Sequence, residues 1–346
     1  MNAIDRQSTW EQDALLTTID PKFAFLLGMF FPRIKQFTTS TIEYDVVEGG
    51  IRIAPFASPF SLGASSRRRG HRTVTIQPAY IKLLDTVRPS EGFTRMPGEP
   101  YGGQYSPEER LAMIVAEQIA THHEMIETRW EQMAAEVLFT GKLTITQDNY
   151  PTAVADFERD ANLTITAGTV WSDAGADIVG DIEAAADKIN VSSRGSVASS
   201  IVTSNGVWDK MRKNATVREL VDTTKNVSPQ TQGIELGPRG ADKHPVRRGV
   251  LSGRYEIWTY DGYYENDAGA AVPFVPANKV LLSAPGGVEG VRYHGAIIDM
   301  DAGMQPHEVF TKTKRQWNPS GEEVLTQSAP MLGMRRANAT AVLTVG

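Results

Sequence analysis

A long amphipathic segment that starts at Ser106 constrains the fold of this chain more than any other feature of its sequence. Ser106 is a favourable N-cap residue, Pro107 takes the first helical position, and Glu109 completes a capping box. Gly141 ends the pattern. Between these limits, apolar residues recur close to the helical period: Leu111, Ile114, Val115, Ile119, Ile126, Trp130, Met133, Val137 and Leu138. We therefore expect a helix over residues 106–140, roughly 50 Å long.

Two charged features of opposite sign accompany this helix. Another of its faces carries an acidic stripe, which consists of Glu117, Glu124, Glu127 and Glu131. Upstream lies a basic cluster that contains Arg67, Arg68, Arg69 and Arg72. The cluster has three interpretations: a nucleic-acid patch, a solvated loop tip, or a clamp between subunits. We favour the clamp, because arginine pairs well with carboxylates and the nearby sequence lacks the interleaved aromatic residues of single-strand binders. These eight residues are the expected intersubunit contacts.

The remaining segments predict an α+β protein with an insertion. Residues 1–57 resemble an extended arm with a β-hairpin turning at Gly49-Gly50, and residues 58–87 a protruding β-loop with the basic cluster at its tip. We place the long helix in a domain over residues 88–175 and a separate α/β domain over residues 176–302. Residues 303–346 are β-like and end in an alternating strand, which we expect to pair with the long-helix domain.

Composition excludes several functions. The 346 residues include no cysteine, which removes disulfides, thiolate zinc sites and cysteine nucleophiles. With 35 basic and 41 acidic residues the net charge is −6, so no global positive field exists to hold phosphates. We expect no secretion signal at the N-terminus, and the longest apolar run, residues 23–31, is far shorter than a membrane span.

The motifs of enzymes and metal proteins are also missing from the sequence. We find no nucleophile elbow, phosphate-binding glycine loop or dinucleotide fingerprint. The six histidines follow no metal-ligand spacing, and we interpret His122-His123-Glu124 as part of a solvated helix face. Asp299 and Asp301 are two apart in what reads as extended chain, so their side chains should point to opposite faces. We expect no catalytic, metal or cofactor-binding residues; a carboxylate-dependent hydrolase is the remote alternative.

Several stretches, in order along nearly the whole chain, resemble the Hong Kong 97-type phage capsid fold, and specifically its lambda-type branch, the phage capsid protein E family. They are Phe37-Thr38-Thr39, Ser58-Pro59, Pro78 with Tyr80 and Lys82, Gly141-Lys142, Val275-Pro276-Ala277-Asn278-Lys279-Val280-Leu281, Arg292-Tyr293-His294-Gly295 and Gln327-Ser328-Ala329-Pro330-Met331-Leu332. In that family's terms the β-loop is the E-loop, the long helix is the spine of the P-domain, and the insertion is the A-domain.

The resemblance implies a non-enzymatic major capsid protein of the virion, made in the host bacterial cytoplasm. Its partners would be copies of itself, arranged as pentamers and hexamers of an icosahedral shell, together with a separate scaffolding protein and a portal protein. The resemblance leaves room for a decoration protein. The shell would enclose double-stranded DNA without sequence-specific binding and without a membrane. The alternative with the same architecture is the shell protein of an encapsulin-like nanocompartment.

Overall fold

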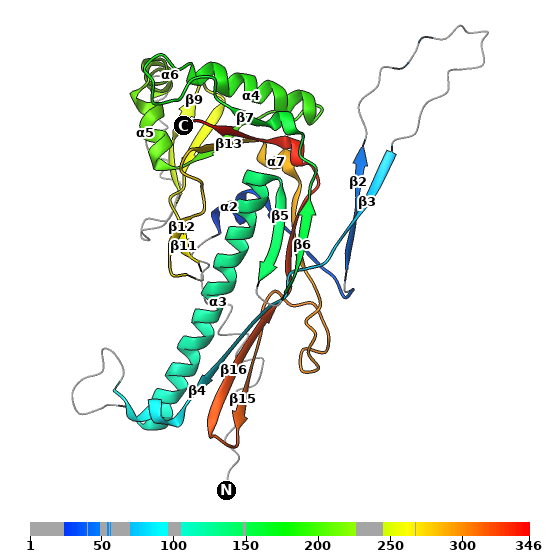
Figure 1. Ribbon diagram of the computed structural model, residues 1–346, viewed down its shortest axis with the longest axis vertical. Coiled ribbons are helices and arrows are strands. Elements are labelled where there is room, and N and C mark those ends of the chain that lie inside the picture. The colour runs from blue at the N-terminus through cyan, green and yellow to red at the C-terminus, as the bar shows by residue number, and fades with distance from the viewer. Residues whose placement is uncertain are drawn as a thin grey trace.

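The helix α3 (Pro107–Thr140) forms the axis of the lower half of the molecule in the computed structural model (Figure 1). A sheet with helices forms the upper end, and a two-stranded ribbon projects to one side. The structure describes residues 24–39, 41–48, 54, 56, 70–95, 105–147, 150–225, 245–266 and 268–346.

Both ends of α3 are fixed by specific contacts. At the N-terminus the Ser106 hydroxyl accepts a hydrogen bond from the Glu109 amide at 3.2 Å, and the Glu109 carboxylate accepts one from the Ser106 amide at 2.7 Å. Gly141 ends the helix in the left-handed conformation, with φ 75°. Beside it, the Arg159 guanidinium donates to the carbonyls of Leu138 (2.8 Å) and Phe139 (3.1 Å). The predicted helix and its capping box are confirmed.

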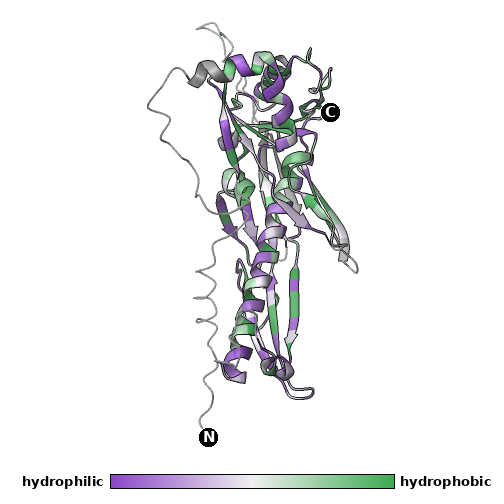
Figure 2. Ribbon diagram, turned by 90° about the vertical axis from the view of Figure 1, so that its left-hand side faces the viewer, coloured by the Kyte–Doolittle hydropathy of each residue, from purple (hydrophilic) through white to green (hydrophobic). Residues whose placement is uncertain are grey.

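A three-stranded antiparallel sheet lies along the lower part of α3, and its strands come from distant parts of the chain. Its order is β15 (Phe310–Gln316), β16 (Gly321–Ser328), β4 (Ile81–Val87). The short helix η1 (Pro89–Phe93) connects β4 toward α3. The contact between sheet and helix is a small apolar cluster of Val87, Val115, Ile119 and Val324. In Figure 2 hydrophilic and hydrophobic residues alternate along α3, as expected for a helix with one face on a sheet.

The upper end is a six-stranded mixed sheet with three helices. In sheet order its strands are β7 (Thr164–Thr166), β18 (Thr340–Thr344), β13 (Lys279–Ser283), β8 (Ser200–Thr203), β10 (Tyr255–Thr259) and β9 (Val246–Leu251). The helices are α4 (Ile178–Ser192), α5 (Asn205–Lys213) and α6 (Ala215–Lys225). Apolar residues of these helices and strands form one buried cluster.

The C-terminal strand β18 bears out one prediction in part. We expected it to pair with the long-helix domain, and it does pair with β7, which lies within residues 88–175, but it also pairs with β13 inside the six-stranded sheet. Four of its five residues are buried, so both faces are covered. Its alternation of small and branched residues, Thr340-Ala341-Val342-Leu343-Thr344, is therefore not an inside-outside pattern. The C-terminal strands that contact α3 are β16 and β17 (Pro330–Met334).

The upper half of α3 packs into the largest core, together with the first described segments. These are α2 (Phe25–Phe30) and β1 (Arg33–Gln36), which pairs with β14 (Gly290–His294); β14 in turn pairs with β17 (Pro330–Met334). The short helices α7 (Pro285–Val288) and η4 (Ala337–Ala339) flank this three-stranded sheet. The core includes Leu26, Phe30, Trp130, Leu138 and Tyr293.

The other elements are one short helix and three pairs of strands. The helix is η2 (Ala161–Leu163). The pairs are β5 (Lys142–Gln147) with β6 (Tyr150–Asp156), β11 (Tyr263–Glu265) with β12 (Ala271–Pro273), and the ribbon of β2 (Ile42–Glu48) with β3 (Gly70–Ile76). In the ribbon the described partner of β2 is β3, while residues 51–53, the second half of the expected hairpin, lie outside the described residues. Gly49-Gly50 lies outside the described residues.

The capping of α3 gives a test of its contribution to stability. Ser106→Ala removes the acceptor of the Glu109 amide and should lower the free energy of unfolding by about 1 kcal/mol. Urea denaturation measures the change. Ser106→Asp keeps an acceptor at the cap and should retain most of the stability; equal losses for both variants would contradict the capping account.

Candidate assembly surfaces

The ribbon of β2 and β3 is anchored at its base and projects from the body of the molecule (Figure 1). Its register runs from Ile42 opposite Ile76 to Glu48 opposite Gly70. Ile42 is fully buried in the main core, and beyond β3 the Ala79 amide donates to the Pro330 carbonyl at 3.0 Å. Within the described part of the chain the two strands pair only with each other. An isolated two-stranded ribbon is marginally stable in water. The outer edges of this ribbon carry backbone N–H and C=O groups that no other described strand pairs.

Only one residue of the basic cluster belongs to the described part of this ribbon. Arg67, Arg68 and Arg69 lie outside the described residues. Arg72 is in β3, where its backbone lies opposite Val46. The cluster is therefore continuous in sequence with the end of the ribbon that is opposite Ile42.

The acidic stripe is not a uniform surface. Glu117 is exposed, and Glu124 and Glu127 are partly buried. Burial, followed by the charge of Glu124, raises the pKa of Glu127 to about 7. Glu131 is fully buried. The expectation that Glu131 contacts another subunit is wrong for this structure, since its carboxylate is occupied within its own chain.

Glu131 and Arg292 hold the two ends of α2. The Glu131 carboxylate accepts hydrogen bonds from the amides of Leu26 (2.8 Å) and Leu27 (3.1 Å), in the first turn of the helix. Arg292 Nε donates to the Phe31 carbonyl, just past the last turn, at 2.9 Å. A negative group at the N-terminus and a positive group at the C-terminus both suit the helix dipole. Burial raises the pKa of the Glu131 carboxyl, and the two amide hydrogen bonds act in the opposite direction.

The contacts around α2 define the root of the arm. Alone, a helix of six residues is unstable in water. Here Glu131 and Arg292 hold it, and β14 approaches it so closely that a Cβ on Gly290 would lie 2.1 Å from the Phe30 carbonyl oxygen. The first described helix of the chain is thus fixed against α3 and β14.

Two adjacent histidines on α3 correct the prediction of a solvated helix face, because both are buried. His122 lies between α3 and the sheet, with Nδ1 3.0 Å from the Thr326 hydroxyl and Nε2 2.8 Å from Asp85 Oδ2. The hydrogen bond from His122 lowers the pKa of the Asp85 carboxyl. A hydroxyl, an imidazole and a carboxylate in a row resemble a hydrolytic triad. However, Thr326 is fully buried, so its hydroxyl is out of reach of a substrate.

The other two buried imidazoles have ring nitrogens that make no hydrogen bond. His123 Nε2 and both ring nitrogens of His294 are buried without a hydrogen bond. Burial lowers the pKa of both histidines to about 4, with smaller contributions from the charges of His122 on His123 and of Arg292 on His294. His294 packs against Trp130 of α3 at a ring-centroid distance of 5.2 Å. Neutral imidazoles therefore form part of the contact between α3 and β14.

Asp299 and Asp301 also differ from expectation. We predicted that their side chains point to opposite faces of an extended chain, but they lie in a loop and both contact Lys312 Nζ at 2.7 Å. The Gln327 amide donates to Asp299 Oδ2 at 2.8 Å. The pair thus fixes the loop between β14 and β15.

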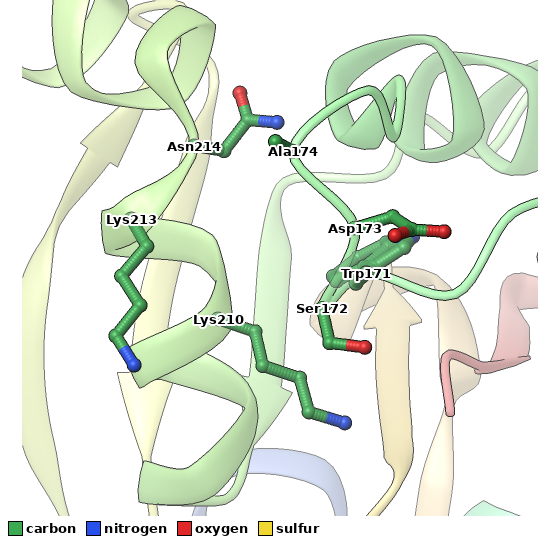
Figure 3. Close-up of a pocket in the computed structure, with 7 residues that line it drawn as sticks. All are labelled: Trp171, Ser172, Asp173, Ala174, Lys210, Lys213 and Asn214. Atoms are coloured by element: carbon green, nitrogen blue, oxygen red, sulfur yellow. The ribbon is translucent and has the colours of Figure 1, made fainter.

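The described residues offer little that resembles a small-molecule site. A shallow pocket beside α5 is lined by Trp171, Ser172, Asp173, Ala174, Lys210, Lys213 and Asn214 (Figure 3). The Trp171 indole there donates to Asp181 at 2.9 Å. Among the described residues no group of three or more His, Asp or Glu side chains is placed to hold a metal ion. In the same part of the chain, no helix has both the length and the apolar character to cross a membrane.

Replacement of Glu131 tests the root of the arm. Glu131→Ala leaves the two buried amides of Leu26 and Leu27 without their acceptor, so we expect the free energy of unfolding to fall by roughly 3 kcal/mol. Hydrogen exchange at Leu26 and Leu27 should quicken at the same time. Glu117→Ala, on an exposed position of the same helix, is the matched control and should change neither quantity. Unchanged exchange at both amides would contradict the role of Glu131 in holding α2.

The buried histidines predict a loss of stability in acid. The unfolded chain takes up protons near the ordinary histidine pKa of about 6.5, whereas the folded chain does so only near 4. The stabilisation is therefore complete above pH 6.5 and is lost as the pH falls toward 4. His294→Phe keeps a ring against Trp130 and should remove up to about 3 kcal/mol of this dependence.

Denaturation at several pH values compares the two proteins directly. Because Glu127 contributes in the opposite direction and is present in both, the difference between wild type and variant isolates His294 and its charged neighbours Arg292 and Glu308. Parallel stability curves from pH 7 to 4 would rule out this role of His294.

Comparisons with known proteins agree over nearly the whole chain. Residues 8–345 match the phage major capsid protein E family. The major capsid protein of Escherichia phage N15 is 26% identical over 338 residues, which cover 94% of this chain and 96% of that protein. The major capsid protein of Enterobacteria phage P21 is 24% identical over 318 residues, or 89% and 90% of the two chains.

The fold is also that of a phage capsid protein. A crystal structure of a prophage capsid protein from E. coli CFT073 superposes with a TM-score of 0.72 at 21% identity, covering 98% of this chain and 99% of that one. The expected α+β, Hong Kong 97-like fold is thereby confirmed. The projecting ribbon, the long helix, the α/β sheet and the match over residues 8–345 lead to one assignment: the chain belongs to the phage major capsid protein E family.

Proposed function

We propose that this chain is the shell subunit of a tailed-phage head. Copies assemble into pentamers and hexamers, and these tile an icosahedral shell that encloses double-stranded DNA. The observation that carries the proposal is the family match over residues 8–345. The ribbon of β2 and β3 supports it, since its edges are unpaired within the described chain and suit a neighbouring subunit.

Many modest contacts suit this role better than one strong contact. Each subunit of a shell touches several neighbours, so the sum of weak contacts makes the particle stable while single errors reverse. The projecting ribbon and the lower sheet are separate surfaces for such contacts (Figure 1). The net charge of −6 suits a container from which DNA must later leave.

The division of labour follows the family's plan. Residues 1–57 form the arm and 58–87 the E-loop, which lies over an adjacent subunit. Residues 88–175 and 303–346 form the peripheral P-domain, and residues 176–302 the A-domain at the capsomer centre. The six-stranded sheet modifies this division, because β7 and β18 belong to the sheet of the A-domain although their residues lie outside 176–302.

The basic cluster and the acidic stripe are proposed as one intersubunit contact. Arg67, Arg68, Arg69 and Arg72 on the ribbon of one subunit pair with Glu117, Glu124 and Glu127 on another. Exposed Glu117 and partly buried Glu124 and Glu127 suit this pairing. Glu131 is left out because it holds α2.

Further partners belong to the same proposal. A separate scaffolding protein directs assembly, a portal protein occupies one vertex, and a decoration protein has room on the outside. The protein acts without catalysis and is synthesised in the host bacterial cytoplasm before it enters the virion. An encapsulin-like nanocompartment shell is the alternative with the same fold, and it would lack a portal and packaged DNA.

Electron microscopy of the purified protein with its scaffold tests both the function and the charge pairing. Wild type should form closed or tubular particles. Reversal of the four arginines to glutamate should abolish them, because each expected pair becomes a repulsion. Adding Glu117→Lys and Glu124→Lys to that variant should restore assembly in part.

Substitution of the four arginines by lysine is the matched control, since it keeps the charge and removes the bidentate geometry. It should assemble with increased sensitivity to salt. A wild-type protein that stays monomeric with its scaffold would refute the shell function. Full assembly of the charge-reversed variant would refute the pairing alone.

A further inference from the structure

A loop on the lower sheet carries a group of exposed apolar side chains. It connects β14 to β15 and spans residues 295–309. Ile298 is 82% exposed, Met300 92% and Met304 64%. Contiguous apolar residues on a soluble protein mark contact sites, and methionine is enriched in such sites. We call Ile298, Met300 and Met304 the loop patch.

The loop patch is held in place by the loop's own contacts. Its two sides are joined by a bridge between Ala296 and Pro306, and the Ile297 amide donates to the Gln305 carbonyl at 3.1 Å. A buried cluster that contains Ile297, Ala302 and Phe310 lies beneath. The contacts of Lys312 with two aspartates, described above, attach the loop to β15. Binding to a pre-ordered patch loses little conformational entropy.

A second exposed group lies at the other end of the same strand. Trp317 is 94% exposed in the turn between β15 and β16. Tryptophan is among the residues most enriched at the energetic centres of protein interfaces. The indole is almost entirely exposed. The hairpin that carries it is held by the pairing of β15 with β16.

One chain cannot bring these two groups together. Lys312 on β15 contacts the loop at Asp301, and Trp317 lies five positions farther along the chain. At about 3.3 Å per residue this is roughly 16 Å of extended strand. The strand is paired with β16 along its length, so it does not bend to close the gap. Contact between Trp317 and a loop patch therefore requires a second molecule.

We propose that Trp317 of one copy packs against the loop patch of a second copy. The inference rests on the proposed shell function, because a shell brings identical chains together at high local concentration. Methionine sulfur against an aromatic ring is a favourable contact. The charged groups beside both surfaces already face opposite charges in their own chain, since Lys314 and Arg315 lie opposite Glu323 and Glu322 and Asp301 contacts Lys312, so the contact is an apolar one. Such a contact joins different surfaces of the two copies, and around a rotation axis it closes into a ring.

Cysteine cross-linking tests the contact without disturbing it. The chain has no cysteine, so every thiol is an introduced one. Ser320→Cys places a thiol beside Trp317, and Gln305→Cys places one beside the loop patch; both positions are exposed. Shells assembled from an equal mixture of the two variants are treated with a short bis-maleimide. We expect covalent dimers from the mixture and none from either variant alone.

A second measurement uses the tip itself. Trp317→Ala should raise the protein concentration needed for assembly by at least about tenfold, as expected for an interface anchor. Trp317→Phe should lie between that variant and wild type. Since the side chain is exposed, unassembled Trp317→Ala should unfold like wild type.

The outcomes separate this inference from the shell function. Failure of wild type to assemble refutes the shell function and, with it, the contact. If wild type assembles but the mixture yields no dimers and Trp317→Ala assembles normally, the contact is refuted and the shell function stands. Dimers from Ser320→Cys alone would show that tips meet tips, and this would also refute it.

Discussion

The burial of α3 against segments from every part of the chain is the constraint on which this structure depends. Glu131 of α3 holds α2. His122 joins α3 to β4 through Asp85 and to β16 through Thr326. Arg159 holds the C-terminal end of α3. These contacts are polar and largely buried, so each is costly to leave unpaired. The long helix therefore supplies apolar surface to the core and also fixes the positions of the segments that pack against it.

A well-fixed frame explains how other regions remain incomplete without harm. The ribbon of β2 and β3 is joined to the core at Ile42 and Ala79, while its edges face outward. The loop patch and Trp317 are held by β15 and β16, and β15 is an edge strand of the three-stranded sheet. Exposed edges and apolar groups are liabilities for a monomer, but they become contacts when identical neighbours cover them. The subunit thus combines a firmly packed centre with projecting segments whose strand edges and apolar side chains are left for neighbouring copies to cover.

Local signals in the sequence predicted local structure well, and contacts across the chain less well. The capping box at Ser106 and the stop at Gly141 defined α3, because both act within a few residues. The strand at residues 340–344 pairs with β7 of the expected domain, but its second partner β13 was not foreseen, since Ala and Thr fit a strand buried on both sides as well as a half-buried one. Glu131 and the two histidines looked solvated because a helical stripe does not reveal which element covers it. Arg159 and Arg292 have no local signal that foretells their carbonyl partners. The loop arginines stay a prediction, and three of them lie outside the described residues.

We propose that other copies of the chain complete the projecting ribbon of β2 and β3. Hydrogen–deuterium exchange of the backbone amides at residues 42–48 and 70–76, before and after assembly, tests this most directly. The account predicts rapid exchange in the unassembled subunit and at least about tenfold slower exchange in assembled particles, as unpaired edges acquire partners or cover. Protection that is already complete in the unassembled subunit, or exchange that stays rapid in the particle, would contradict it.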